Sequence, residues 1–226
     1  MINGLPPIRY YARSNGDLKL AQNSAADGSG TWTITTIDSA TDVGRHTSLK
    51  PLVGGYGIAY RGITDTSLKF AYELSCAGIS FPYTLVAGTQ SELVNAIQCA
   101  NANGAGSDTI NLNGLNVPLL AATPFGDYLG RTALPQITTN IVIRNGTLRH
   151  DSSGGGFLNR TFSVASTGTL NLERVVLDGD EGPSPGGAIH NSGTTNITNC
   201  TFTGYRTSNR AGVLHNGSGA TANIAN

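Results

Sequence analysis

The sequence has little charge, and this shortage limits the classes of protein that it can represent. Asp, Glu, Lys and Arg make up 12% of the 226 residues, about half the share of roughly 25% that is typical of globular proteins. The 14 basic residues balance the 14 acidic ones, whereas disordered chains carry high net charge and nucleic-acid-binding domains carry a basic patch. We therefore expect neither disorder nor a nucleic-acid partner. Glycine, threonine, asparagine and serine replace the charges, which favours an all-β fold with many turns.

Long apolar runs, a leader sequence and a cysteine framework are also missing. No run approaches the roughly 18 apolar residues of a transmembrane segment, and "MINGLPPIRYY" lacks the basic and apolar regions of a signal peptide. The chain has three cysteines, Cys76, Cys99 and Cys200. Their odd number and their spacing argue against a zinc site and against a dense disulfide framework. Buried thiols are the favoured prediction, because free cysteine behaves as a small hydrophobe. A Cys76–Cys99 bridge stays open as the alternative.

The first third of the chain contains a repeat of 50 residues. "GLPPIRYYARSNGDLKLA" resembles "GGYGIAYRGITDTSLKFA", with Ile8 on Ile58 (58 − 8 = 50) and Tyr10 on Tyr60. Short strand-like runs alternate with turns such as Asn15-Gly16, a strong hairpin signal. The repeat has the size of a β-propeller blade, but residues 1–75 hold only about one and a half units, and a propeller needs roughly 4–8 blades. We predict a small antiparallel meander of propeller-blade-like repeats.

Trp32 and the paired tyrosines Tyr10 and Tyr60 are among the large aromatic residues of this part. One interpretation is a sugar-binding aromatic platform, with Trp32 as a candidate ligand-binding residue. The favoured interpretation is that they pack between sheets, because large aromatics supply most of a small core.

After residue 75 one helix is predicted, at about 90–103. Thr89 and Glu92 have the spacing of a capping box, and Gly104 supplies a left-handed C-terminal cap. The helical spacing i, i+3, i+4, i+7 gives one apolar face: Leu93, Ala96, Ile97 and Ala100. "FPYTLVAG", before the helix, is predicted to be one strand.

The last third repeats every 25 residues. "GTLNLERVVLDG" aligns with "TTNITNCTFTG", so that Leu172 falls on Ile197 (197 − 172 = 25), and "ATANIAN" follows at 27 (224 − 197). Helix-free units of this length predict a right-handed parallel β-helix over residues 76–226, in which corresponding residues stack about 4.8 Å apart. Its expected core is Leu170, Leu172, Val175, Leu177, Ile197, Cys200 and Phe202. The helix would cap the exposed end of the stack.

These residues resemble a known family. "SELVNAIQCANANGAGSDTINL", "LPQITTNIVIRNG", "GGAIHNSG" and "NCTFTG" are similar to the start of bacterial surface β-helix proteins with a CSLREA-type N-terminal segment, and to polymorphic outer-membrane adhesins, whose pectin-lyase-like fold carries GGAI repeats. The resemblance covers roughly residues 80–226. It implies a secreted or cell-surface protein, and a chain that is a fragment of a larger bacterial protein.

Two groups of residues are candidates for a site. Asp178, Asp180 and Glu181 offer hard oxygen ligands for calcium or for sugar chemistry, although calcium takes about 6–8 oxygens and the residues one coil away are Thr203, Tyr205 and Arg206. A solvated loop is the favoured interpretation. His190 and His215 should stack in adjacent coils, beside Asn191 and Asn216. They form either a paired-imidazole ligand site or, as we favour, a structural ladder.

The function that the sequence favours is a non-enzymatic adhesin-like β-solenoid that binds host-surface or polysaccharide ligands. No catalytic residue, metal site or cofactor is assigned, with calcium as the open alternative. The rival functions are a polysaccharide lyase or hydrolase and a pure structural spacer. Convergence of an acidic residue of the 178–181 cluster with another carboxylate or an arginine in one groove would favour the enzyme. We also expect self-association through the open C-terminal coil, at about 211–226.

Overall fold

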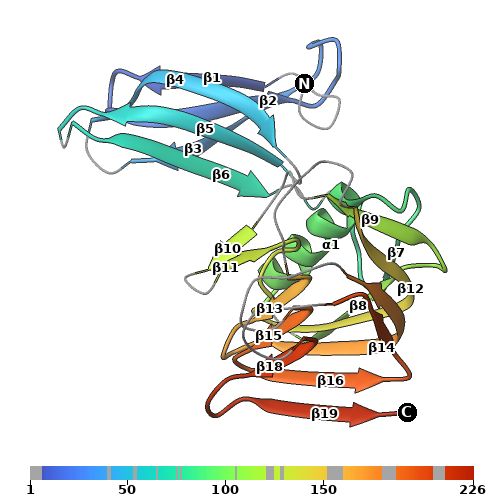
Figure 1. Cartoon of the computed structure of the whole chain (residues 1–226). Helices are drawn as coiled ribbons and strands as arrows, with labels where there is room; N and C mark the ends of the chain where they lie inside the picture. The colour runs from blue at the N-terminus through green and yellow to red at the C-terminus, as the bar shows by residue number, and fades with distance from the viewer. Residues whose placement is uncertain are drawn as a thin grey trace. The chain divides into compact units, whose positions relative to one another are not determined.

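A computed structural model gives the fold of the chain (Figure 1). It describes residues 7–39, 42–52, 55–64, 66–74, 76, 78–104, 106–120, 125–127, 130–151, 160–179, 187–205 and 212–226. The chain divides into two compact units, Met1–Ala77 and Gly78–Asn226. The predicted fold class is confirmed, since small antiparallel sheets precede a parallel β-solenoid of about four turns.

The first unit consists of two three-stranded antiparallel sheets. One contains β1 (Pro7–Ala12), β2 (Asp17–Asn23) and β3 (Trp32–Asp38), and the other β4 (Val43–Leu52), β5 (Gly55–Gly62) and β6 (Leu68–Leu74). The 50-residue repeat corresponds to the hairpins β1–β2 and β5–β6, which have the same register: Ile8 pairs with Ala21, and Ile58 pairs with Ala71. Both sheets contribute to a small core of Leu18, Leu20, Val43, Ile58 and Tyr60.

The second unit begins with β7 (Tyr83–Thr84) and α1 (Gln90–Ala102). Thr89 accepts a hydrogen bond from the Glu92 amide at 3.2 Å, as the capping box predicts. The Glu92 carboxylate instead accepts from the amides of residues 86–88 and from the Tyr83 hydroxyl. These amides bind a side chain rather than a strand, so the prediction of one strand over "FPYTLVAG" is wrong except for Tyr83 and Thr84. Gly104 has the expected left-handed conformation, with φ of 77°.

The solenoid is built from parallel sheets in which each coil pairs with the next (Figure 1). The larger sheet joins β7 to β8 (Ser107–Asn111), β9 (Asn116–Leu120), β12 (Asn140–Asp151), β14 (Thr169–Asp178), β16 (Thr194–Thr198), β17 (Thr201–Thr203) and β19 (Thr221–Ala225). A second sheet contains β13 (Phe162–Val164), β15 (Ile189–Asn191) and β18 (Leu214–Asn216). A short antiparallel hairpin, β10 (Phe125–Asp127) and β11 (Gly130–Thr132), interrupts the coils.

The predicted register of the last coils is confirmed. Leu172 pairs with Ile197, and Ile197 pairs with Ile224, which reproduces the offsets of 25 and 27. Of the predicted core residues, Leu170, Leu172, Val175, Leu177 and Ile197 are buried, while Cys200 and Phe202 are half-buried against them. The earlier coils are longer: Ile141 pairs with Leu170 at an offset of 29 (170 − 141). The 25-residue repeat therefore does not extend to them.

The helix covers the end of the solenoid, as predicted. Its four expected apolar residues are fully buried in the same core as the strand residues Ile110, Ile141 and Leu148. Two polar side chains extend this contact. Gln90 bonds to the backbone of residues 120 and 133, and Asn101 bonds to the backbone of residues 136 and 138. These four hydrogen bonds fasten the helix to the backbone of the neighbouring coil, and the bond from Gln90 to Ala133 satisfies a carbonyl of a buried residue.

The cysteines correct one expectation. Cys76 and Cys99 are disulfide-bonded, so the prediction of buried thiols is wrong for them, and only the half-buried Cys200 is a free thiol. The sequence could not choose between thiols and a bridge, because the distance between the two sulfur atoms depends on the fold.

No helix in the described part of the chain is long and apolar enough to cross a membrane.

Candidate functional site

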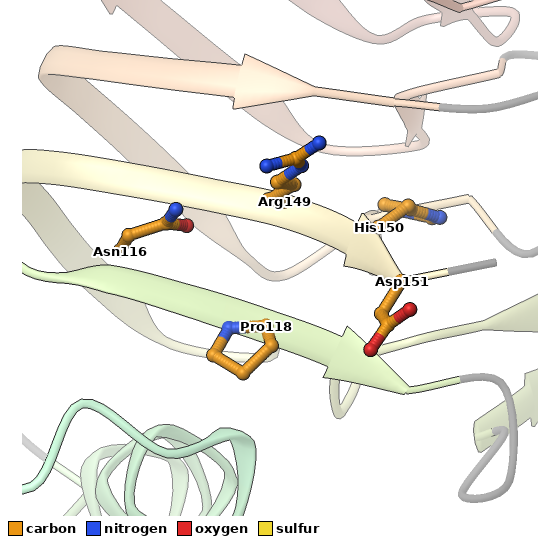
Figure 2. Close-up of a pocket in the computed structure, with 5 residues that line it drawn as sticks. All are labelled: Asn116, Pro118, Arg149, His150 and Asp151. Carbon is orange, nitrogen blue, oxygen red and sulfur yellow. The ribbon is translucent and has the colours of Figure 1, made fainter. Parts of the chain in front are cut away.

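An open polar pocket of about 450 Å³ lies on the side of the solenoid (Figure 2). Asn116 and Pro118 on β9 line one side of it, and three consecutive residues at the end of β12 line the other: Arg149, His150 and Asp151. Apart from Pro118, the lining residues are an amide, a guanidinium, an imidazole and a carboxylate. Such a surface offers several directional hydrogen bonds beside some apolar area, so it suits a polar ligand.

Parallel pairing and a backbone corner position these side chains. β9 and β12 pair so that Pro118 lies opposite Arg149 and Leu119 opposite His150. Strand alternation directs Leu148 into the core and leaves Arg149 exposed. Asn145, just upstream, has a left-handed φ of 59°, and a Cβ on Gly146 would come within 2.5 Å of the Leu112 Cβ. The chain therefore turns tightly before it enters the pocket.

The same corner recurs in the next two coils. Arg174 and Asn199 also have positive φ, 51° and 53°, although left-handed backbone is uncommon outside glycine. Arg174 donates from Nε to the Asn145 side-chain oxygen at 2.8 Å. The Arg174 side chain thus ties two corners together.

A chain of hydrogen bonds holds His150 at the edge of the pocket. Its Nε2 lies 3.0 Å from Thr161 Oγ1, which lies 2.6 Å from the Tyr205 hydroxyl. The Tyr205 ring also packs edge-on against the imidazole, with ring centroids 5.9 Å apart. Burial raises the pKa of the Tyr205 phenol well above its ordinary value. Tyr205 thus stays a neutral hydrogen-bonding group at physiological pH and helps to fix the imidazole.

Asp178, one of the predicted acidic residues, lies beside this pocket. Its Oδ2 is 3.3 Å from Arg149 Nε, and its Oδ1 accepts from Thr203 Oγ1 at 3.0 Å. Thr203 is its register partner in the next coil, as predicted. Both carboxylate oxygens therefore bind neighbouring coils, and since the Arg149 and Asp178 side chains are largely exposed, the pair adds at most about 1 kcal/mol to stability.

The calcium prediction depends partly on residues outside the described part of the chain. Asp180 and Glu181 lie outside it. Within the described residues, no three His, Cys, Asp or Glu side chains gather as a metal ion requires. Calcium binding by Asp178, Asp180 and Glu181 stays a prediction.

His190 and His215 form the predicted stack. They pair in register on β15 and β18, with ring centroids 5.2 Å apart and planes inclined by 10°. The Asn191 amide donates to the Asn216 side-chain oxygen at 2.7 Å, so the asparagine ladder is confirmed. Parallel rings direct their nitrogen lone pairs side by side, which is a poor geometry for holding one metal ion between them. Whether either histidine binds a ligand stays a prediction.

Trp32 is exposed, although the favoured prediction is that it packs between the sheets. It is 39% exposed on β3, opposite Asn23, and is not part of the buried core. The interpretation that it packs between the sheets is therefore wrong. Tyr60, by contrast, is buried and donates from its hydroxyl to Asp38 at 2.7 Å. A sugar contact by Trp32 stays a prediction.

Sequence reasoning missed the pocket itself. Arg149, His150 and Asp151 belong to a long coil outside the 25-residue repeat, so no alignment of repeats drew attention to them. The available signal was three consecutive titratable residues, "RHD", at the end of a strand-like run in a chain that is poor in charge.

Comparisons with known proteins add no assignment to this geometry. No protein-family description, curated protein or solved structure matches the chain.

Proposed function

We propose that this chain is part of a secreted or cell-surface, adhesin-like β-solenoid that binds polysaccharide without changing it chemically. The observation that carries the proposal is the open pocket at the end of β12, in which four of the five lining residues are polar or charged. Its amide, guanidinium, imidazole and carboxylate suit a ligand that is rich in hydroxyl groups. Both signs of charge are present, which favours a neutral or weakly charged glycan over a polyanion.

The proposed location outside the cytoplasm is supported by the cysteines. Cys76 and Cys99 are disulfide-bonded, and disulfides persist mainly in oxidising environments such as the cell exterior or a bacterial periplasm. The resemblance of residues 80–226 to bacterial surface β-helix proteins points the same way.

Glycan-array binding by the whole chain tests the proposal. Arg149→Met removes the guanidinium while keeping an unbranched side chain, and we expect at least a tenfold loss of affinity for any glycan that binds. Arg174→Met is the matched control, because Arg174 lies in the next coil and bonds to Asn145 rather than lining the pocket. Equal binding by wild type and Arg149→Met would place the ligand elsewhere. A complete lack of glycan binding would favour a structural spacer.

One observation favours a second candidate, a carbohydrate-active enzyme. Asp178 contacts Arg149 beside a pocket that also contains Asp151 and His150. Hydrolysis of a glycosidic bond uses two carboxyl groups, one as general acid and the other as general base or nucleophile. Against this, both oxygens of Asp178 already bind Arg149 and Thr203.

An activity assay separates the two candidates. The whole chain is incubated with each bound polysaccharide, and unsaturated sugars and new reducing ends are measured. Binding without products supports the adhesin. Turnover that Asp151→Asn abolishes while binding persists would establish the enzyme.

A further inference from the structure

Corresponding residues of the 50-residue repeat have opposite exposures. On β2, Leu18 and Leu20 are 0% and 3% exposed, whereas their equivalents on β6, Leu68 and Phe70, are 85% and 63% exposed. The reverse holds on the preceding strands. Ile58 on β5 is 1% exposed, and its equivalent Ile8 on β1 is 52% exposed. The two repeats therefore bury opposite faces of the same hairpin.

The register shows which faces these are. In both hairpins the isoleucine pairs with an alanine and the following tyrosine pairs with a lysine: Ile8–Ala21 and Tyr10–Lys19 in the first, Ile58–Ala71 and Tyr60–Lys69 in the second. Because side chains alternate along a strand, these residues share one face, and the two large apolar residues of β2 or β6 lie on the other. We call them the isoleucine face and the leucine face.

Inside the first unit, the leucine face of one hairpin packs on the isoleucine face of the other. Leu18 and Leu20 from β2 form one buried cluster with Ile58 and Tyr60 from β5. Two faces remain outward. The first sheet exposes its isoleucine face, which Ile34 of β3 extends because it pairs with Ala21 and is 58% exposed. The second sheet exposes its leucine face, Leu68 and Phe70.

We propose that a second copy of this chain docks on the first unit head to tail, with the isoleucine face of one copy packed on the leucine face of the other. The exposed faces are the two halves of an interface that the same sequence motif already forms internally. Exposed apolar patches of this kind mark interaction sites. The contact is heterologous, since each copy uses a different face, so it leaves one face of each type open to further copies.

A twofold-symmetric dimer does not follow from these observations. It would place leucine face on leucine face, or isoleucine face on isoleucine face, and neither combination occurs between the two sheets. The proposal is independent of the glycan pocket, because the residues of the two faces belong to the first unit and those of the pocket to the second.

Single-face variants of the whole chain test the geometry by sedimentation velocity. Phe70→Glu blocks the leucine face, and Ile34→Glu blocks the isoleucine face. Both side chains are exposed, so each variant should keep the wild-type circular dichroism. Leu68→Glu and Ile8→Glu serve as second variants for the same faces. Ser14→Glu, in the exposed turn after β1, is the control for added charge.

We expect the wild type and Ser14→Glu to assemble with rising concentration and each single-face variant to remain a monomer. An equimolar mixture of Phe70→Glu and Ile34→Glu should form a one-to-one dimer and grow no further. The intact isoleucine face of Phe70→Glu can pack on the intact leucine face of Ile34→Glu, and the two remaining faces are blocked. Three results would overturn the proposal: a monomeric wild type, a mixture that stays monomeric, or assembly that persists when both faces are blocked in one chain. The last would place self-association elsewhere, such as on the edge strand β19.

Discussion

Replacing Gln90 tests how α1 closes the end of the solenoid. The side chain is buried, and its amide donates to the Ala133 carbonyl at 2.8 Å while its oxygen accepts from the Leu120 amide at 2.8 Å. Gln90→Met keeps the apolar stem and removes both bonds. The Ala133 carbonyl belongs to a buried residue, so leaving it without a hydrogen bond should lower the free energy of unfolding by about 1–3 kcal/mol. Leu120 is half-exposed, so water can reach its amide and limit that loss to about 1 kcal/mol.

The expected total is a loss of about 2–4 kcal/mol in the free energy of unfolding of the second unit. At a urea dependence near 2 kcal/mol per molar, the midpoint measured by circular dichroism falls by about 1–2 M. Trp32 is the only tryptophan and lies in the first unit, so the fluorescence transition should not move. Ser91→Ala, exposed on the same helix, is the matched control. A Gln90→Met midpoint that equals the wild-type value would refute the reasoning.

Three further outcomes are expected. Glu92→Gln replaces a carboxylate that accepts from the amides of residues 86–88 with a neutral amide, so it should cost about 1.5–3 kcal/mol and speed hydrogen exchange there, measured by mass spectrometry; unchanged protection would contradict this. Burial raises the pKa of Tyr205 above the ordinary 10.0, so above that pH the unfolded state releases a proton that the folded state keeps, and stability should fall by about 1.4 kcal/mol per pH unit. In urea titrations between pH 8 and 11, the free energy of unfolding should fall less for Tyr205→Phe than for the wild type. The same fall in both proteins would count against a raised Tyr205 pKa. Burial also raises the pKa of the Cys200 thiol, so one thiol should react slowly in the folded chain and rapidly in urea, with two more only after reduction; three thiols without reductant would disprove the disulfide.

The pocket and the two exposed faces give the chain separate means of contact. The pocket lies along two paired parallel strands, β9 and the end of β12, which both contribute polar side chains to it. The outward faces of the first unit expose large apolar side chains, among them Ile8, Ile34, Leu68 and Phe70, which suits a protein partner. A chain with both would bind a glycan through one unit and assemble through the other, and the variants above test the two properties independently.

Local sequence patterns predict much of the fold. The helical spacing of Leu93, Ala96, Ile97 and Ala100 was sufficient to place α1, because a 3.6-residue period identifies its buried face. The offsets of 25 and 27 were sufficient to set the register of β14, β16 and β19, because stacked coils place like residues on like residues. The same register predicts that His215 stacks on His190, and the two residues do pair.

Only the tertiary structure decided features that depend on segments distant in sequence. The pocket brings Asn116 beside Arg149 across a coil that is longer than the 25-residue repeat. Whether Cys76 and Cys99 are oxidised depends on the distance between sulfur atoms in the folded chain. The exposure of Trp32 depends on which face of its sheet is covered. Repeat identity even predicts the wrong exposure for Leu68 and Phe70, since equivalent residues are buried only where another hairpin covers them. Sequence thus determined the helical period and the strand pairing of the last coils, which are local or repeated properties. Which faces meet, and which remain open, is a property of the assembled chain.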